Sequence, residues 1–328
     1  MTAAAARSPL ATLVDPDWLD PTSHLAFLKA SFPGQWDRAA YDWYVARAFN
    51  GRRSEVLVRA EGTRILAGVT LCYRQISVAA SPPMDVCVLS AGATVSSERG
   101  RGHYDSLLHA ALARAREKAC GALLGFTTRD NGSARGLIRL GARAIPSFYI
   151  VSDDRPRMRG RSPSRAAASR RRAPVHRQRA VDSAFARLAR RRVVLPAPSN
   201  ASQVRFHYER TEDWSQQFIH RPHAVRAIRL AHDSLALIET VRDTDRLQWL
   251  DCPDGKAVAN IAALVAASAV TARKFFMYTL DPRQAAAARR VGLGTRGGYL
   301  LMLPTGHSSA GCDRLAHAVW RVQSGDRL

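Results

Sequence analysis

Two distant stretches of the chain repeat one order of elements. Residues 122–151 and 274–303 each hold a short apolar run, a polar turn, an Ala- and Arg-rich segment ending in Gly, and a second apolar run. This order is typical of strand, helix and strand. A shared order of elements can arise by chance, but 328 residues exceed what one core usually holds. We therefore expect a divergent internal duplication that gives two similar α/β units.

The two expected units are separated by an arginine-rich segment. Residues 155–192 contain fourteen arginines and a single acid, Asp182, and the first part is rich in Ser and Pro with almost nothing to bury. Such composition is typical of a solvated linker, and the alternative is a tether for nucleic acid or another polyanion. We expect a first domain at 1–153, a basic linker at 154–200 and a second domain at 201–328.

The overall charge is a weak guide to partners. The net charge is +22, but arginine supplies all but four of the 49 basic residues. Because a high-GC genome enriches arginine together with alanine, a nucleic-acid partner is admissible but not favoured. The five cysteines are scattered without a CxxC pair, and His220 and His223 lack a third donor nearby, so we expect reduced thiols and no metal.

No segment indicates a membrane partner. The longest apolar run, 257–270, fits a buried helix better than a bilayer span. The N-terminal residues have no apolar core of signal-peptide length before Asp15. The expected location is therefore cytoplasmic, and nothing in the sequence indicates the oligomeric state.

Periodicity predicts the elements of both halves. Helices are expected at 21–32, 36–49, 104–119 and 131–140, and strands at 55–62, 63–78, 84–95, 122–128 and 144–151. Strands 55–62 and 63–78 should form a hairpin through Glu61, Gly62 and Thr63. In the second half, strands are expected at 224–230, 235–242, 246–252, 274–280 and 297–304, and helices at 257–272 and 281–292.

The turn between strand 84–95 and helix 104–119 is the most informative local feature. Its sequence from Glu98 to Tyr104 is ERGRGHY. A helix N-terminus presents unpaired N–H groups and a positive dipole end, and glycines let the backbone approach an anion. The turn is neither a Walker loop nor a GxGxxG fingerprint. It predicts a phosphate or pyrophosphate site, with a plain strand–helix turn as the alternative.

The order around this turn resembles the GNAT superfamily of N-acyltransferases. The resemblance rests on Arg99-x-x-Gly102, Asn131 with Ala134, and Leu140-Gly141-Ala142, and it spans residues 54–151. It implies an α/β fold with a mixed central sheet flanked by helices, in two tandem copies. It also implies acetyl-CoA or another short acyl-CoA as co-substrate. By position, the resemblance implies Ala93 and Thr94 at the pantetheine, a backbone N–H near Ala93–Val95 at the developing oxyanion, and Asn131 at the pantetheine arm. At the pyrophosphate it implies Gly100, Arg101, Gly102, His103 and Tyr104, with added charge from Arg99 and Arg101.

The sequence departs from the family pattern at two positions. Tyr104 stands where the family prefers Gly or Ala, which its side chain could tolerate by turning into the core. Ile138 stands where many members carry a Tyr that protonates the leaving thiolate. That role is then unfilled, or falls to water, to Tyr73 or to Tyr149.

The general base is not evident from the sequence. Asp85 on the expected strand and Glu98 in the turn are weak candidates, and Glu98 is as well explained as a charge at a helix start. His103, next to the expected phosphate, is better explained as an N–H donor or a solvated side chain. The catalytic residues are therefore unknown, with Asp85, Glu98 and Tyr149 as weak candidates.

Two functions from different classes fit these features. The first is an acyltransferase that moves an acetyl or short acyl group from acyl-CoA to a small-molecule or protein amine by direct attack. The second is a non-catalytic scaffold of the same fold that binds nucleic acid or another polyanion through the linker. The second half lacks an Arg-x-x-Gly turn, so we expect no CoA binding of the same kind there.

Overall fold

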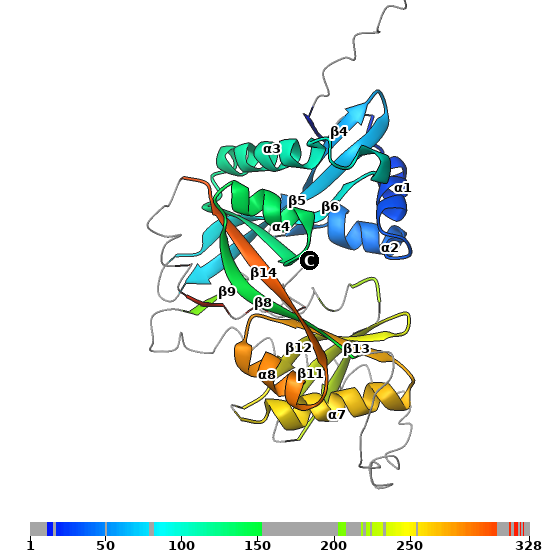
Figure 1. Ribbon diagram of the computed structural model, residues 1–328, viewed down its shortest axis with the longest axis vertical. Coiled ribbons are helices and arrows are strands. Elements are labelled where there is room, and N and C mark those ends of the chain that lie inside the picture. Colours follow the sequence, from blue (N-terminus) through cyan, green and yellow to red (C-terminus); the bar gives the residue numbers. More distant parts are fainter. Residues whose placement is uncertain are drawn as a thin grey trace, which may run out of the picture. The chain divides into compact units, whose positions relative to one another are not determined.

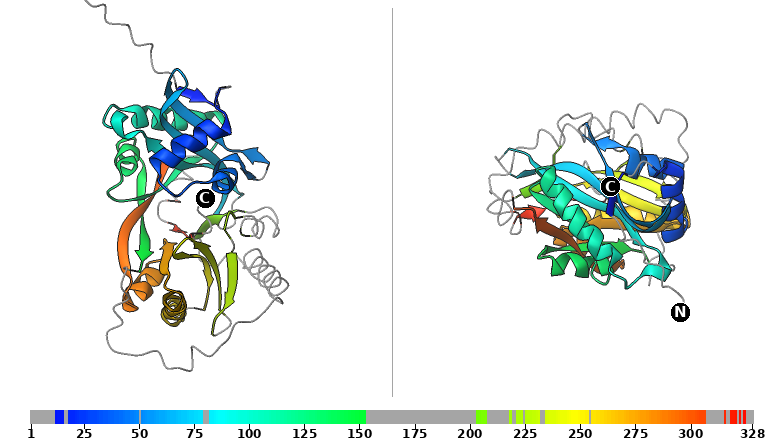
Figure 2. Two further views of the ribbon diagram at one scale, coloured as in Figure 1. Left: turned by 90° about the vertical axis from the view of Figure 1, so that its right-hand side faces the viewer. Right: turned by 90° about the horizontal axis from the view of Figure 1, so that it is seen from above.

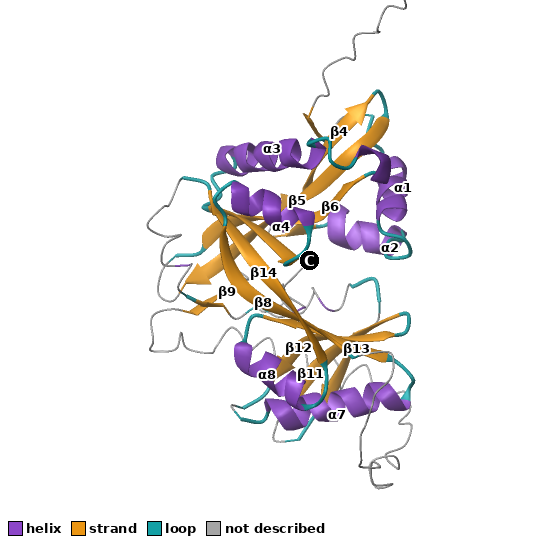
Figure 3. Cartoon of the chain, viewed as in Figure 1, coloured by secondary structure: helices purple, strands orange, loops and turns teal. Residues whose placement is uncertain are grey.

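The chain divides into two compact units that are not consecutive stretches of sequence. The computed structural model describes residues 12–15, 18–49, 51–78, 82–152, 203–207, 218, 221–223, 225–231, 234–253, 255–306, 315, 318–320, 322 and 324. Unit 1 comprises residues 1–76, 83–145 and 300–317, and unit 2 comprises 77–82, 146–299 and 318–328. The expected linker, 154–200, lies outside the described residues. Figure 3 shows the helices and strands by type.

Unit 1 is a mixed sheet covered by helices. Its strand order is β1-β4-β5-β6-β7-β14. Strands β1, β4, β5 and β6 pair antiparallel in that order, and β6 pairs parallel with β7. The elements are β1 (Thr12–Val14), α1 (Pro21–Ser31), α2 (Arg38–Tyr41), a π-helical turn (Asp42–Ala46), β2 (Ala48–Phe49), β3 (Arg52–Arg53), β4 (Glu55–Glu61), β5 (Arg64–Val78), β6 (Met84–Thr94), a 3₁₀ turn (Ser96–Glu98), α3 (His103–Glu117), β7 (Ala122–Thr128) and α4 (Gly132–Arg139).

The helices of unit 1 cover opposite faces of its sheet (Figure 1). Leu28 of α1, Tyr41 of α2 and Val45 of the π-helical turn pack with Val56 and Val58 of β4. Side chains alternate along a strand, so the odd-numbered residues of β4 face the other helices. Figure 2, left, shows α1 in blue lying across the strands that it covers.

The helix expected at 36–49 is shorter than its apolar pattern predicts. Residues 38–41 are helical, 42–46 form a π-helical turn, and 48–49 form β2. Arg47 has an extended backbone (φ −71°, ψ 142°), and its guanidinium lies 3.6 Å from the Trp43 ring centroid and 3.8 Å from that of Phe49. These cation–π contacts favour the chain leaving the helix at Arg47, which helical periodicity does not show.

A strand from the end of the chain completes unit 1. β14 (Gly294–Pro304) runs from unit 2 into unit 1, where residues 300–304 lie beside β7. Leu300, Leu301 and Met302 are fully buried. Just beyond the strand, the Thr305 hydroxyl donates to the Cys120 carbonyl, and the Thr305 carbonyl accepts from Arg116 Nε at 2.8 Å. Residues 300–305 are therefore built into the core of unit 1.

Unit 2 repeats the same architecture with fewer helices among its described residues. Its strand order is β14-β8-β13-β12-β11-β10, and β9 pairs with β15. The elements are β8 (Arg143–Val151), β9 (Gln203–Phe206), β10 (Val225–Arg229), β11 (Leu235–Val241), β12 (Thr244–Asp251), α7 (Ala257–Val270), β13 (Lys274–Thr279), α8 (Pro282–Arg290), the first part of β14 and β15 (Val319–Trp320).

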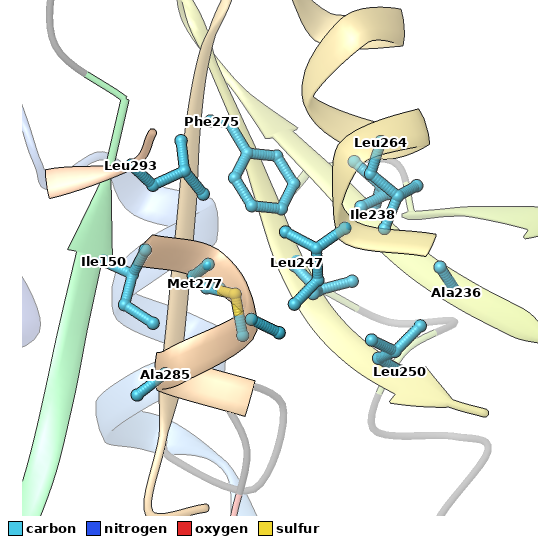
Figure 4. Packing of buried hydrophobic residues seen from close by; sticks show 13 residues of the cluster. Ile150, Ala236, Ile238, Leu247, Leu250, Leu264, Phe275, Met277, Ala285 and Leu293 are labelled. Carbon is cyan, nitrogen blue, oxygen red and sulfur yellow. The ribbon is translucent and has the colours of Figure 1, made fainter. Parts of the chain in front are cut away.

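One apolar cluster joins α7 and α8 of unit 2 to the strands. Figure 4 shows Leu264 of α7 and Ala285 of α8 in one cluster with Leu247, Phe275 and Met277 of the strands. The strand and helix expectations for both halves are confirmed, apart from residues 36–49. In the described parts of the chain no helix is long and apolar enough to cross a bilayer.

Candidate functional site

The glycine turn of unit 1 places two left-handed residues before α3. The end of β6 is fixed because Val95 N donates to the Leu66 carbonyl at 2.9 Å. After the 3₁₀ turn, Gly100 has φ +79° and Gly102, the N-cap residue of α3, has φ +76°. A Cβ atom at either glycine would meet no other atom within 4 Å. The glycines are therefore required by backbone conformation rather than by crowding.

The turn leaves a row of backbone N–H groups without partners. Within the part of the chain that is described, none of the N–H groups from Gly100 to Tyr104 donates to a backbone carbonyl, and no side chain caps α3. These N–H groups stand at the positive end of a 15-residue helix. An anion with several oxygens, such as a phosphate, fits this donor set.

The side chains around the turn carry excess positive charge. Glu98 is almost buried and pairs with Arg101 at 3.1 Å, with His103 Nε2 at 3.4 Å and with Arg64 at 3.5 Å. Arg99 Nε donates to the Thr94 carbonyl at 3.4 Å. Arg64 also pairs with Glu61 at 3.6 Å. Two carboxylates thus stand beside three arginines, and the remaining positive charge favours an anion at the turn. The pairing also shows that Glu98 holds the turn together instead of standing free as a base.

Strands β6 and β7 separate where they approach the turn. Their parallel pairing runs from Val86↔Ala122 to Leu89↔Gly125 and stops there, although β6 continues to Thr94 and β7 to Thr128. A bulge in β6 accompanies the separation, and Ala91 has φ +50°. The edge of β6 from residue 90 to 94 therefore has no strand partner on the β7 side. We call this opening the split.

The comparisons with known proteins agree with this geometry. No family model matches the sequence, and no curated protein matches it. The structure is similar to a GCN5-related N-acetyltransferase from Kribbella flavida, at 14% identity over 92% of this chain and 72% of that chain, with a TM-score of 0.52. It is similar to a tandem GNAT protein from the clavulanic acid biosynthesis pathway, at 13% identity over 90% of this chain and 98% of that chain, with a TM-score of 0.56.

The chain has the GNAT fold, in a tandem arrangement. At these identities the likeness concerns the fold alone. The fold class expected from the resemblance, a mixed sheet flanked by helices in two copies, is confirmed.

Tyr104 turns its side chain inward, onto Gly92 of β6. A Cβ atom at Gly92 of β6 would stand 2.5 Å from the Tyr104 hydroxyl and 3.0–3.1 Å from two ring carbons, so the ring lies directly on the backbone of β6. Burial raises the pKa of Tyr104 to about 12.

Asn131 acts on α4. Its Oδ1 accepts from Ser133 N at 3.0 Å and from Ser133 Oγ at 3.0 Å, which caps the helix. Ser133 Oγ also lies 3.3 Å from the Thr127 hydroxyl of β7. The far side of the split is thus lined by a short chain of hydroxyl and amide groups.

Three of the catalytic possibilities lie elsewhere. Asp85, at the start of β6, accepts from Arg52 at 2.7 Å and Gln75 at 2.9 Å, at the opposite end of the strand from the split. Tyr73 donates to Glu55 at 2.7 Å near the C-terminal end of α3. Tyr149 belongs to unit 2, where its ring packs edge-on against Tyr278.

The sequence expectation missed Gly92 and Ser133. A glycine inside a strand signals a bulge or a close approach of another group, and this signal was available for Gly92. Nothing in the sequence marked Ser133 as a site residue, because a serine two residues after an N-cap is common. Ile138 is 45% exposed, so the position expected for the acid carries an apolar, solvent-facing side chain.

Unit 2 repeats the split without the glycine turn. The parallel pairing of β12 and β13 stops at Leu247↔Met277, and the register shift against β11 leaves Gln248 as a bulge. Gln248 Nε2 donates to Glu239 at 2.6 Å, and Glu239 pairs with Arg221 at 3.2 Å, with all three side chains buried. Buried polar side chains thus occupy the neighbourhood of this bulge.

Proposed function

We propose that unit 1 binds an acyl-CoA and transfers its acyl group to an amine. The observation that carries the proposal is the junction of a free strand edge, residues 90–94 of β6, with the unpartnered N–H groups of residues 100–104. A pyrophosphate fits the N–H groups, and the amides of a pantetheine arm fit the strand edge. Only unit 1 has both features among the described residues.

The residues of unit 1 support parts of this chemistry. Acyl-CoA supplies a thioester, which an uncharged amine attacks at the carbonyl carbon. The unpaired N–H groups of β6 at the split can donate to the carbonyl oxygen as it gains charge. Arg99 and Arg101 neutralise the phosphates. Neither Asp85 nor Glu98 is free to accept the amine proton, so we assign that proton to water.

Calorimetric titration with acetyl-CoA tests the binding. Gly102→Asp places a carboxylate beside the N–H groups and should weaken binding by roughly tenfold or more. Gly51→Asp is the matched control, because Gly51 also has a positive φ (+72°) with no atom near its Cβ position, between β2 and β3. Equal affinities of the two variants would refute the assignment of the turn.

A thiol-release assay with a panel of amines separates the enzyme from the scaffold. Acyl transfer liberates one CoA thiol for each acylated amine, which a thiol reagent detects. Tight binding of acetyl-CoA without amine-dependent thiol release would support the non-catalytic alternative. That alternative also requires retention on nucleic acid at moderate salt that is lost when residues 155–179 are deleted.

A further inference from the structure

A cavity of about 660 Å³ opens in unit 1 at the start of β4. The other end of β4 is the one near the glycine turn, because Arg64, just after that end, pairs with Glu98 of the turn. No residue of β6 or of the glycine turn lines the cavity. Its volume is typical of small-molecule sites. The cavity is therefore a second candidate site, separate from the split.

The buried part of the lining offers a surface for packing. Tyr41, Val45 and Tyr73 line the cavity and are all buried. The hydroxyls of both tyrosines are engaged, because that of Tyr41 hydrogen-bonds His24 Nδ1 at 3.2 Å and that of Tyr73 donates to Glu55 at 2.7 Å. An apolar group of a ligand therefore fits this part of the cavity better than a polar one.

Ion pairs engage three of the five charged residues that line the cavity. Glu55 accepts from Arg114 at 2.7 and 2.8 Å, and it pairs with Lys118 at 3.2 Å. Arg52 pairs with Asp85 at 2.7 Å. These three lining residues thus already have partners of opposite charge.

Asp15 and Arg53 are the remaining two charged residues, and both are exposed at the mouth of the cavity. Asp15 Oδ1 accepts from Val56 N at 2.7 Å, whereas no described residue donates to Oδ2. The Arg53 side chain has no hydrogen bond or ion pair with a described residue. Partial burial raises the pKa of Asp15, and the charge of Arg53 opposes that rise although the two groups form no ion pair. A carboxylate and a guanidinium therefore stand near each other with a gap between them.

We propose that this cavity binds an amino acid with an apolar side chain: Asp15 pairs with the ammonium group, Arg53 pairs with the carboxylate, and the side chain packs on Tyr41 and Val45. A purely anionic ligand would leave Asp15 unpaired, and a purely cationic ligand would leave Arg53 unpaired. A zwitterion satisfies both charges at once, through charge-assisted hydrogen bonds. The site does not depend on the function proposed for the glycine turn.

Three probes separate the two ends of the ligand. L-leucine carries both charges, N-acetyl-L-leucine lacks the ammonium group, and L-leucinamide lacks the carboxylate. Their affinities are measured by calorimetry with the full chain and with Asp15→Asn and Arg53→Gln. Asparagine keeps an oxygen for Val56 N and tolerates the left-handed backbone of Asp15, φ +41°.

An exposed ion pair supplies matched control variants. Arg38 and Asp42 lie on either side of the lining residue Tyr41, pair at 2.9 Å and do not line the cavity. Arg38→Gln and Asp42→Asn remove the same charges as the two test variants, so they should leave all three affinities unchanged.

Each variant should lose one end of the ligand. The unaltered chain should bind leucine at least roughly tenfold more tightly than either analogue, since each analogue lacks one charge-assisted contact. Asp15→Asn should weaken leucine and leucinamide by roughly tenfold and leave N-acetyl-leucine within about twofold. Arg53→Gln should weaken leucine and N-acetyl-leucine by the same factor and leave leucinamide within about twofold.

The comparison of probes on the unaltered chain decides the proposal even where a variant fails to fold, which a thermal melt would show. Absence of leucine binding, or equal affinities for the three probes, overturns it. Leucine affinity that neither variant changes overturns the assignment of Asp15 and Arg53. Loss of leucine binding in saturating CoA shows that the two sites are one and contradicts the separate cavity. Failure of acetyl-CoA to bind counts against the proposed function alone.

Discussion

Replacing Gly92 by Ala tests the packing of Tyr104 without any ligand. Gly92 has no positive φ, so the substitution adds no backbone strain. The whole effect comes from the new methyl group, 2.5 Å from the Tyr104 hydroxyl and 3.0–3.1 Å from two ring carbons. Overpacking of this kind costs about 1–3 kcal/mol. Alanine also fits a strand better than glycine by about 0.5–1 kcal/mol, so a net loss of about 0.5–2 kcal/mol is expected.

Gly121→Ala provides the matched comparison. A Cβ atom at Gly121 would also stand 2.5 Å from a neighbour, but the neighbour is the Met84 sulfur, near the end of a flexible side chain. Methionine adapts to an added methyl group more readily than a rigid aromatic ring does. We therefore expect Gly121→Ala to cost less than Gly92→Ala although the static distances are equal.

Urea unfolding followed by circular dichroism measures both changes. A double-mutant cycle with Tyr104→Ala isolates the contact, because without the ring Gly92→Ala should become neutral or stabilising. Two results would contradict the reasoning: equal costs for Gly92→Ala and Gly121→Ala, or an unchanged cost of Gly92→Ala when Tyr104 is alanine. Either would mean that the ring does not lie on β6.

Three further predictions concern unit 1. Gly102→Ala should cost about 1–2 kcal/mol from its positive φ alone, whereas Gly132→Ala at the start of α4 should cost nothing in the same urea titration. Burial raises the pKa of Glu55, but hydrogen bonds from neighbouring side chains outweigh burial and lower the pKa from 4.5 to about 2. The contribution of Glu55 to the free energy of unfolding should therefore fade as pH falls from 4.5 toward 2, and Glu55→Gln should lack this pH dependence. Burial lowers the pKa of His24 from 6.5 to about 4. The free energy of unfolding should therefore decrease as pH falls from 6.5 to 4, and His24→Phe should not show this decrease.

Local sequence signals predicted most of the elements. The hairpin of β4 and β5 follows from two β-rich runs around Gly62, and α3 follows from apolar residues on one helical face. The glycine turn was identifiable because Gly100 and Gly102 lie between a strand and a helix. These features depend on neighbours in the chain, which a single sequence records.

The features that the sequence did not predict depend on distant residues. The exit of the chain at Arg47 depends on two aromatic rings. The ion pair of Asp85 depends on Arg52, and the inward position of the Tyr104 ring depends on Gly92. The position of residues 300–304 beside β7 depends on pairing between strands far apart in the chain. Periodicity shows which face of a segment is buried and not what covers it.

The place of β14 also bears on the order in which the protein can fold during synthesis. Until residues 300–304 emerge from the ribosome, β7 has an open edge and the Cys120 carbonyl lacks the Thr305 hydroxyl. Parallel and long-range strand pairing is slow, and an open edge invites association with other chains. The amino-terminal half therefore cannot complete its fold ahead of the rest. A nascent chain released before residues 300–304 are made would be a target for chaperones or proteases, and the glycine turn would stand in a finished unit only once those residues are in place.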